Sequence, residues 1–397
     1  MQYDFDEIID RRNTNAVKIE LCKTLFGTND VIPLWVADMD FRTPDFILDA
    51  IVNRCKHPIL GYTTVPRDYF TIITHWLQLL HRWEVKQEWL GFLPGIVPGI
   101  AFALNAFTTE NDEVIVQTPV YPPFLDVPSK NNRKVVVNPL KEISGRFEMD
   151  FEDIESKITE RTKLFILCNP QNPGGRTWDE ETLKKLAEIC WEHHVVVVSD
   201  EIHSDLVLPG NKHTPFASVS EEAAQNSITF MAPSKTFNMA GLVSSFFVIP
   251  NENLRKIMKK FLANSELNNG NIFAYVAAKA AYENGFEWRN QLVNYIQGNV
   301  DFVVDYLKTN IPHVKPMIPQ ATFLIWLDCS GLKMIDDELQ RFMIQKAGLG
   351  LNSGITFGKG GEQHLRLNIG CPRSVLVEAL RKMKSAVDAL SVSSVEN

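Results

Sequence analysis

The chain has 397 residues, of which 45% are hydrophobic and 22% charged, which is typical of a soluble globular protein with two domains. Its formal net charge of −8 argues against nucleic acid or an anionic membrane surface as the main partner, because no basic excess could neutralise phosphates. The acidic amino terminus lacks the pattern of a signal peptide, and no run approaches the ~20 apolar residues of a membrane span, so we expect a cytoplasmic protein.

Two glycine- or proline-rich segments in the first third predict helix starts. Thr43-Pro44-Asp45 offers an N-cap, a proline in the first turn and an acid at the positive end of the helix dipole. Gly95-Ile96-Val97-Pro98-Gly99 precedes a helix that we expect to end near Phe107, and the first amides of that helix could bind a phosphate. Glycine turns before helices are common, so this second pattern alone is weak.

Short apolar runs then alternate with helical patterns. Six runs predict strands: Glu113–Gln117, Val135–Asn138, Leu164–Cys168, Val195–Ser199, Ile228–Met231 and Ser245–Ile249. Several are apolar on both faces, as strands covered by helices on either side must be. Thr177-Trp178-Asp179-Glu180 resembles a capping box that opens a helix reaching about His193. This alternation predicts an α/β domain with a mostly parallel sheet.

The pattern changes after about Asn284 and becomes α+β. The expected elements are a long helix, two strands and two further helices: about Trp288–Lys308, Ala321–Asp328, Gln363–Asn368, Asp336–Lys346 and Pro372–Leu390. We therefore expect a large domain over residues 46–285, and a smaller domain formed by residues 1–45 and 286–397.

Three polar residues stand at informative places in the α/β half. Asn172 lies in a loop rich in proline and glycine, Asp200 ends a strand of four valines, and Lys235 lies in the run Ala232–Leu242. Together they suit a pyridoxal phosphate (PLP) site, where a lysine forms the Schiff base and a carboxylate partners the pyridine nitrogen. Each has a plainer interpretation alone: an ordinary loop, a capped turn and a solvated lysine.

Other residues could complete such a site. Ser234 could bind the same phosphate as the amides of Ile96 and Val97. Tyr121, set among prolines, could stack on the pyridine face or simply pack for its area. Arg366 lies on the polar side of an alternating strand, where its guanidinium could clamp an α-carboxylate or remain solvated.

The six cysteines are scattered, with no C-x-x-C pair. In a cytoplasmic protein such cysteines are expected to be reduced and mostly buried. The histidines near residue 200 match no zinc spacing, so we expect no metal site.

Four strings carry a resemblance to a known family: Leu34–Phe41, Gly61–Thr64, Ser199–Asp205 and Ala232–Asn238. With them the chain resembles fold-type I PLP enzymes of the aspartate aminotransferase superfamily. It is more closely similar to the MalY/PatB group of cystathionine β-lyases, from Phe5 to about Lys384. The resemblance implies a large domain with a mostly parallel sheet flanked by helices, and a smaller α+β domain.

The resemblance also implies roles for individual residues. Lys235 and Tyr121 would be catalytic, and Arg366 with Asn172 would bind the substrate. The implied cofactor-binding residues are Lys235, Asp200, Asn172, His203, Ser234, Tyr121, Ile96, Val97 and Tyr62. His203 stands where aminotransferases commonly have a tyrosine. Tyr62 would reach the phosphate of a neighbouring subunit, which implies a homodimer with shared active sites.

The implied reaction is PLP-dependent β-elimination, which cleaves the C–S bond of cystathionine, cystine or other S-substituted cysteines to a thiol, pyruvate and ammonia. An aminotransferase would use the same Lys235, Asp200 and Arg366, and is the alternative. A PLP-binding regulator that acts through protein–protein contact is a third and less favoured possibility.

Overall fold

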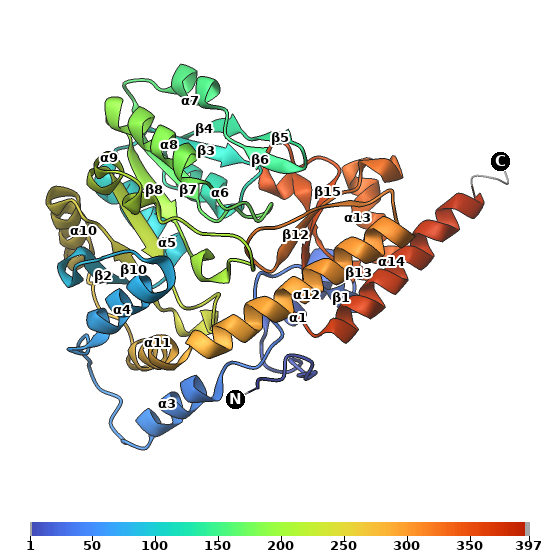
Figure 1. The fold of residues 1–397 in the computed structure, drawn as a ribbon, viewed down its shortest axis with the longest axis horizontal. Coiled ribbons are helices and arrows are strands. Elements are labelled where there is room, and N and C mark those ends of the chain that lie inside the picture. Colours follow the sequence, from blue (N-terminus) through green and yellow to red (C-terminus); the bar gives the residue numbers. More distant parts are fainter. Residues whose placement is uncertain (1, 394–397) are drawn as a thin grey trace.

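A seven-stranded sheet lies at the centre of the structure, a computed structural model that describes residues 2–393 (Figure 1). Its strands are β2 (Leu90–Leu93), β3 (Glu113–Thr118), β4 (Lys134–Pro139), β7 (Thr162–Cys168), β8 (Val196–Asp200), β9 (Ser227–Met231) and β10 (Ser245–Val248). The spatial order is β2-β10-β9-β8-β7-β3-β4. β4, β3, β7, β8 and β9 are parallel, whereas β10 is antiparallel to both β9 and β2. β2 therefore points the same way as the five parallel strands.

The sheet is covered by helices on both faces, which explains why its strands are apolar on both sides. Val114 and Val116 pack in the layer of α5 (Ile96–Phe107), α6 (Pro123–Lys130) and α10 (Glu252–Asn264). The intervening Ile115 packs in the layer of α7 (Phe151–Lys157), α8 (Glu180–Glu192) and α9 (Glu221–Gln225). All six expected strands are confirmed, and the predicted α/β class with them. β2 was not predicted, because four residues with a central glycine are too short for a clear pattern.

Two predicted helix caps are wrong. α8 is capped by Asp179 rather than Thr177: the Asp179 carboxylate accepts the amide of Thr182 at 2.8 Å. α3 (Asp45–Cys55) has no side-chain cap, because the Thr43 hydroxyl donates to the carbonyl of Asn238 at 2.9 Å. The hydroxyl that the sequence pattern predicted to cap the helix thus bonds instead to a residue distant in the sequence.

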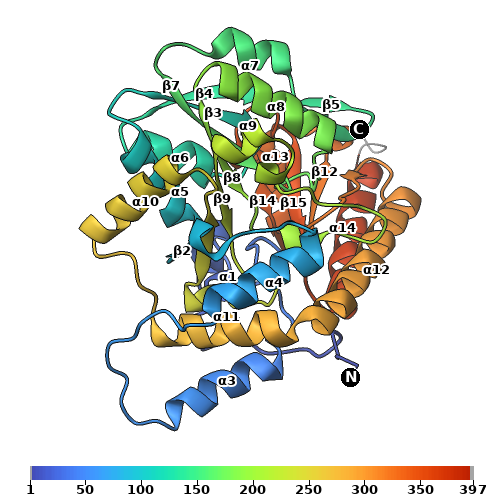
Figure 2. The ribbon, with the colours of Figure 1, turned by 60° about the vertical axis from the view of Figure 1, so that its left-hand side comes forward.

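A second sheet belongs to the carboxy-terminal half. It is antiparallel, with the order β11-β12-β15-β14, formed by β11 (Lys315–Met317), β12 (Leu324–Asp328), β15 (His364–Asn368) and β14 (Asn352–Ser353). β12 begins three residues later than expected, since Thr322 has a φ of 76°, which a strand cannot accommodate. The long α12 (Phe286–Asn310) runs across both halves, and α14 (Arg373–Ser393) lies beside it (Figures 1 and 2).

The amino-terminal segment joins this second half. β1 (Ile32–Pro33) pairs in parallel with β13 (Leu349–Gly350). The remaining α-helices and strands are α1 (Val17–Glu20), α2 (Cys22–Phe26), α4 (Tyr69–His81), α11 (Ile272–Asn284), α13 (Asp336–Gln345), and a hairpin of β5 (Lys141–Ile143) and β6 (Arg146–Glu148). α3 lies at the edge of the structure, and α11 lies between it and the core (Figure 2).

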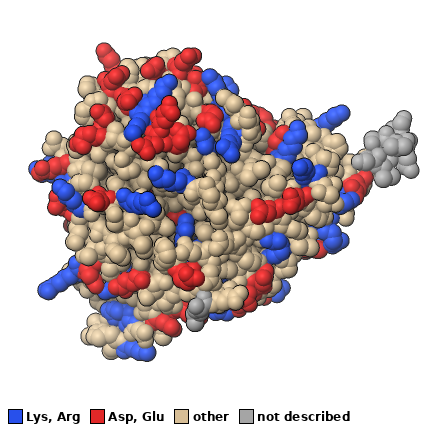
Figure 3. All heavy atoms as spheres, viewed as in Figure 1, with Lys and Arg blue, Asp and Glu red and all other residues tan. Residues whose placement is uncertain are grey.

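Several global features bear on function. Among residues 2–393, no helix is long and apolar enough to cross a membrane, and no group of potential metal ligands is found. All six cysteines are free thiols and five are buried, which confirms the expectation of mostly buried cysteines. Acidic and basic side chains are mixed over the face in Figure 3.

Candidate functional site

Four predicted site residues meet at one edge of the central sheet. Tyr121 follows β3, Asn172 follows β7, Asp200 ends β8, and Lys235 follows β9. The carboxyl ends of parallel strands share an edge, and ligands bind beyond them. The amino terminus of α5 comes to the same edge, because β2 precedes it and points the same way. The order of strands therefore gathers residues from four separate loops.

Lys235 lies at the centre of this group. Its Nζ donates to the carbonyl of Ala37 at 2.5 Å. Burial, and next the Arg366 guanidinium, lower the pKa of Lys235 to about 8. An ordinary lysine has a pKa of about 10.4, so a neutral, nucleophilic amine is far more accessible here. The interpretation of Lys235 as a solvated surface lysine is excluded.

Asp200 is a buried carboxylate that needs a cationic partner. The residue is only 6% exposed, and its Oδ1 accepts a hydrogen bond from the amide of Ile202 at 3.0 Å. Oδ2 has no hydrogen-bond partner among residues 2–393. Burial raises the pKa of Asp200 to about 7. A protonated pyridine nitrogen would satisfy both needs, because it donates a hydrogen bond and carries a positive charge.

This pKa predicts how stability depends on pH in the protein prepared without cofactor. The folded pKa lies above the unfolded value, so folding takes up a proton, and stability is lost as pH rises from about 4 to about 7. The shift corresponds to about 4 kcal/mol. Asp200→Asn should remove this loss and be the more stable protein at about pH 8. Urea unfolding at about pH 5 and pH 8 measures it. The exposed Asp126→Asn is the control, and equal pH slopes for the wild type and Asp200→Asn would refute the prediction.

Arg366 is buried without a carboxylate partner among the described residues. Nη1 donates to Asn172 Oδ1 at 3.1 Å, and Nη2 donates to the Trp35 carbonyl and to Asn352 Oδ1, both at 2.7 Å. Its Nε is buried and has no partner in the part of the chain that the structure describes. Burial lowers the pKa of Arg366 to about 10. A fixed guanidinium with spare donors suits an incoming carboxylate, and the interpretation as a solvated arginine is excluded.

His203 and Tyr121 lie near the same charged groups. The His203 Nδ1 is buried and unpartnered within residues 2–393, and its ring contacts Phe323 edge-on at 6.0 Å. Burial, then Lys235 and Arg366, lower the pKa of His203 to about 3, so the ring is neutral. Burial raises the pKa of Tyr121, so its hydroxyl keeps its proton. Both side chains can therefore donate a hydrogen bond.

The start of α5 offers backbone donors for an anion. Gly95 is the N-cap, and the amides of Ile96 and Val97 lie in the first turn, where no intrahelical acceptor exists. Pro98 has no N–H, so these two amides are the donors of that turn. The mostly buried Ser234 lies beside Lys235, and its hydroxyl could join them.

Tyr62 is not brought to this group. It lies between α3 and α4 with a relative exposure of 110%, and its neighbours Ile59 and Leu60 are also exposed. The tyrosine therefore extends away from its own chain into solvent.

Sequence reasoning missed two contributors to the site. The segment 35–38 crosses it, since Lys235 binds the carbonyl of Ala37 and Arg366 that of Trp35. Asn352 orients Arg366 because β14 places it opposite Arg366 on β15. The string Leu34–Phe41 could have indicated the first, but no local pattern marks Asn352.

The chemistry of these groups fits PLP. The site combines a lysine of lowered pKa, a buried carboxyl group of raised pKa and, among residues 2–393, two buried nitrogens without a partner, His203 Nδ1 and Arg366 Nε. PLP presents an aldehyde, a pyridine nitrogen, a ring hydroxyl and a phosphate, and each finds a suitable group here.

Comparison with known proteins agrees with a site that binds PLP. The sequence profile of the aminotransferase class I and II family matches residues 29–383. The chain is 46% identical to cystathionine beta-lyase PatB of Bacillus subtilis (strain 168), over 97% of this chain and 100% of that protein. It is 29% identical to protein MalY of Escherichia coli (strain K12), over 98% and 100%.

Solved structures give the same picture. Cystalysin from Treponema denticola, with a PLP cofactor, matches with a TM-score of 0.95 and 33% identity, over 98% of this chain and 100% of that one. A PLP-bound C–S lyase from Staphylococcus hominis matches with a TM-score of 0.91 and 38% identity, over 98% of each chain.

Proposed function

Since the chain belongs to the class I and II aminotransferase family, and within it to the cystathionine β-lyases of the MalY/PatB type, we propose that it is a PLP-dependent carbon–sulfur lyase. It cleaves the C–S bond of cystathionine, cystine or other S-substituted cysteines by β-elimination to a thiol, pyruvate and ammonia. The observation that carries this function is the 46% identity to PatB over 97% of the chain. The buried amine, carboxylate and guanidinium at one sheet edge support it.

We propose that the ring of PLP is held by five residues. Lys235 would bind it covalently through the amine of lowered pKa, and Asp200 would pair with the pyridine nitrogen. Asn172 and His203 would bind the ring hydroxyl, and Tyr121 would lie over the ring face. The phosphate would be bound by the amides of Ile96 and Val97 and by the Ser234 hydroxyl.

The chain's own groups then perform the proton transfers and position the substrate. Arg366, held by Asn172 and Asn352, binds the α-carboxylate and so fixes the direction of the Cα–H bond. The freed Lys235 amine removes the Cα proton, for which a pKa near 8 is suitable. When bound, PLP supplies an electron sink for the electron pair left at Cα, supported by Asp200. Loss of the thiolate from Cβ and addition of water give the thiol, pyruvate and ammonia.

Incubation with L-cystathionine tests the reaction. We expect homocysteine and pyruvate to form in equal amounts, with ammonia, and without an added oxo acid. An aminotransferase would need an oxo acid and would release no thiol. Amino-group transfer without release of thiol or pyruvate would therefore replace the lyase assignment with the alternative. Substituting cystine and S-alkyl cysteines one at a time then identifies the preferred substrate.

We propose that two copies of the chain share their active sites. The support is the exposed apolar face of α3 and the loop after it, with Leu48, Val52, Ile59 and Leu60 between 38% and 66% exposed next to Tyr62. Tyr62 would bind the phosphate in the partner. Sedimentation should give the mass of two chains, and Tyr62→Phe should weaken PLP binding by about tenfold without changing that mass. A monomeric, fully active protein would contradict this assembly.

We also propose the division into a large domain of residues 46–285 and a small domain of residues 1–45 and 286–397. The two separate sheets and the pairing of β1 with β13 support it. The five buried free thiols are compatible with our proposal that the enzyme acts in the cytoplasm.

A further inference from the structure

The turn that carries Lys235 is held by the buried carboxylate of Asp205. The hydroxyl of Thr236, the next residue, donates to Oδ2 of Asp205 at 3.0 Å. Asp205 also accepts Nε2 of His81 at 2.9 Å and Nε1 of Trp76 at 3.2 Å. Thr236 and Trp76 are 0% and 1% exposed, and Asp205 is 4% exposed. Three donors therefore bind one carboxylate, two from α4 and one from the turn after Lys235.

This carboxylate carries its charge in the folded protein. Burial acts to raise the pKa of Asp205, but the hydrogen bonds from His81 and Trp76 hold it below its usual value. Hydrogen bonds to an ionised acceptor are shorter and stronger than those between neutral groups. The Thr236 hydroxyl thus donates to a charged acceptor in the interior of the protein.

The rest of the turn is fixed on both sides. The ring of Phe237 packs between Trp76 and Trp288, with centroids 5.8 and 5.7 Å away. On the other side, Nδ2 of Asn238 donates to the carbonyls of residues 39 and 41 at 2.9 and 2.8 Å. Trp76 contacts both Asp205 and Phe237, so α4 supports two consecutive residues after Lys235.

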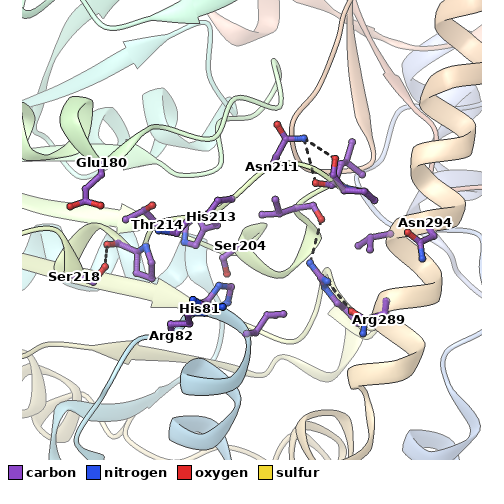
Figure 4. Close-up of a pocket in the computed structure, with 18 residues that line it drawn as sticks. His81, Arg82, Glu180, Ser204, Asn211, His213, Thr214, Ser218, Arg289 and Asn294 are labelled. Atoms are coloured by element: carbon purple, nitrogen blue, oxygen red, sulfur yellow. Dashed lines mark hydrogen bonds between the residues drawn. The ribbon is translucent and has the colours of Figure 1, made fainter.

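The outer end of the network reaches a cavity of about 970 Å³, shown in Figure 4. His81 and Ser204 line it, as do His213 and Arg289. The Nε of Arg289 donates to the backbone carbonyl of Asp205 at 2.6 Å, which fixes the main chain beside the carboxylate. Asp205 is therefore held in place through both its side chain and its backbone. The residues that hold it, Trp76, His81 and Arg289, are not among those proposed to bind PLP or the substrate.

We propose that Asp205 is a positioning residue for Lys235. By binding the Thr236 hydroxyl, it fixes the turn so that the Lys235 amine points toward the segment at Ala37, where PLP and the substrate Cα would lie. This role rests on the proposed function. A displacement of about 1 Å at a reacting group can cost about a hundredfold in rate, so a modest loosening of the turn would be measurable.

Two substitutions of Thr236 test the proposal. Thr236→Val keeps the shape and removes the hydroxyl, whereas Thr236→Ser keeps the hydroxyl and removes a buried methyl group. We expect Thr236→Val to lower kcat by about tenfold with KM within about twofold, and Thr236→Ser to stay within about threefold of wild-type kcat. The pH titration of the visible absorbance of lysine-bound PLP should shift in Thr236→Val alone.

These readouts separate positioning from general stability. If Thr236 only contributed packing, Thr236→Ser would be the more damaging change, because it removes a buried methyl group. Equal kcat values and equal absorbance titrations for the two variants would overturn the proposal. Absence of lysine-bound absorbance in the wild type would instead refute the PLP assignment to Lys235, so the two failures are distinguishable.

A second pair of variants covers the case in which Thr236→Val does not fold. His81→Gln alters the network at its cavity end, and His75→Gln changes an exposed histidine of the same helix. We expect His81→Gln to shift the absorbance titration in the same direction as Thr236→Val and to lower kcat by about threefold. His75→Gln should match the wild type. A His81→Gln variant identical to His75→Gln in both measurements would also overturn the proposal.

Discussion

Lys235→Ala should abolish thiol and pyruvate release and remove the visible absorbance of lysine-bound PLP. The substitution removes the group that would bind the cofactor covalently and the base that would take the Cα proton. Loss of a positioned base alone costs about 10²–10⁴ in rate, so we expect kcat to fall at least a thousandfold. The lowered pKa of about 8 is the structural basis for assigning both roles to this lysine.

Borohydride reduction provides the decisive measurement for this lysine. In the wild type it should fix the cofactor to the peptide that contains Lys235, which peptide mass analysis identifies. The exposed Lys212→Ala is a suitable control, and it should keep full activity and the same labelled peptide. A reducible bond that persists in Lys235→Ala would show that another lysine binds the cofactor.

Arg366→Ala should chiefly raise KM, by about a hundredfold, with a smaller change in kcat. A two-pronged hydrogen bond between guanidinium and carboxylate contributes roughly 1.5–3 kcal/mol, and about 2.7 kcal/mol corresponds to that factor. Arg366→Lys keeps the charge and loses the fork, so its KM should lie between those of the wild type and Arg366→Ala. Steady-state kinetics with L-cystathionine measure both parameters.

A substrate without the α-carboxylate makes this test specific. S-substituted cysteamines should be poor substrates for the wild type. Arg366→Ala should not lower their rate of cleavage any further. The exposed Arg341→Ala should leave both substrate classes unchanged. An unchanged KM for L-cystathionine in Arg366→Ala would remove Arg366 from carboxylate binding.

Local sequence patterns predicted those strands and helices whose side chains have the same environment along the whole element. The valines before Asp200 are buried on both faces, so a continuous apolar run was sufficient to identify β8 and the position of Asp200 at its end. The alternation around Arg366 predicted which side chains of β15 share a face. The sequence could not tell whether that face is solvated, because the answer depends on the packing of Trp35 and Asn352 against it.

Contacts between distant segments account for most of what the sequence did not predict. The Thr43 hydroxyl does not cap α3 as expected, because it donates to the carbonyl of Asn238, 195 positions away. Asp205 ends the string Ser199–Asp205, but no local pattern indicates its partners, since Trp76 and His81 lie on α4, 129 and 124 positions earlier. Such pairs follow from topology, and no periodicity within a window of 10 to 20 residues can encode them.

The segment at residues 35–38 has a consequence for synthesis on the ribosome. The hydrogen bond between Arg366 and the Trp35 carbonyl spans 331 positions. β1 likewise cannot pair until β13 has been synthesised, some 300 residues later. A growing chain can complete the central sheet first, since domains fold as units while translation proceeds. We therefore expect stalled chains that end before β13 to contain Lys235 and Asp200 but to lack Arg366, so that the site for the substrate carboxylate is completed only in the last stage of translation.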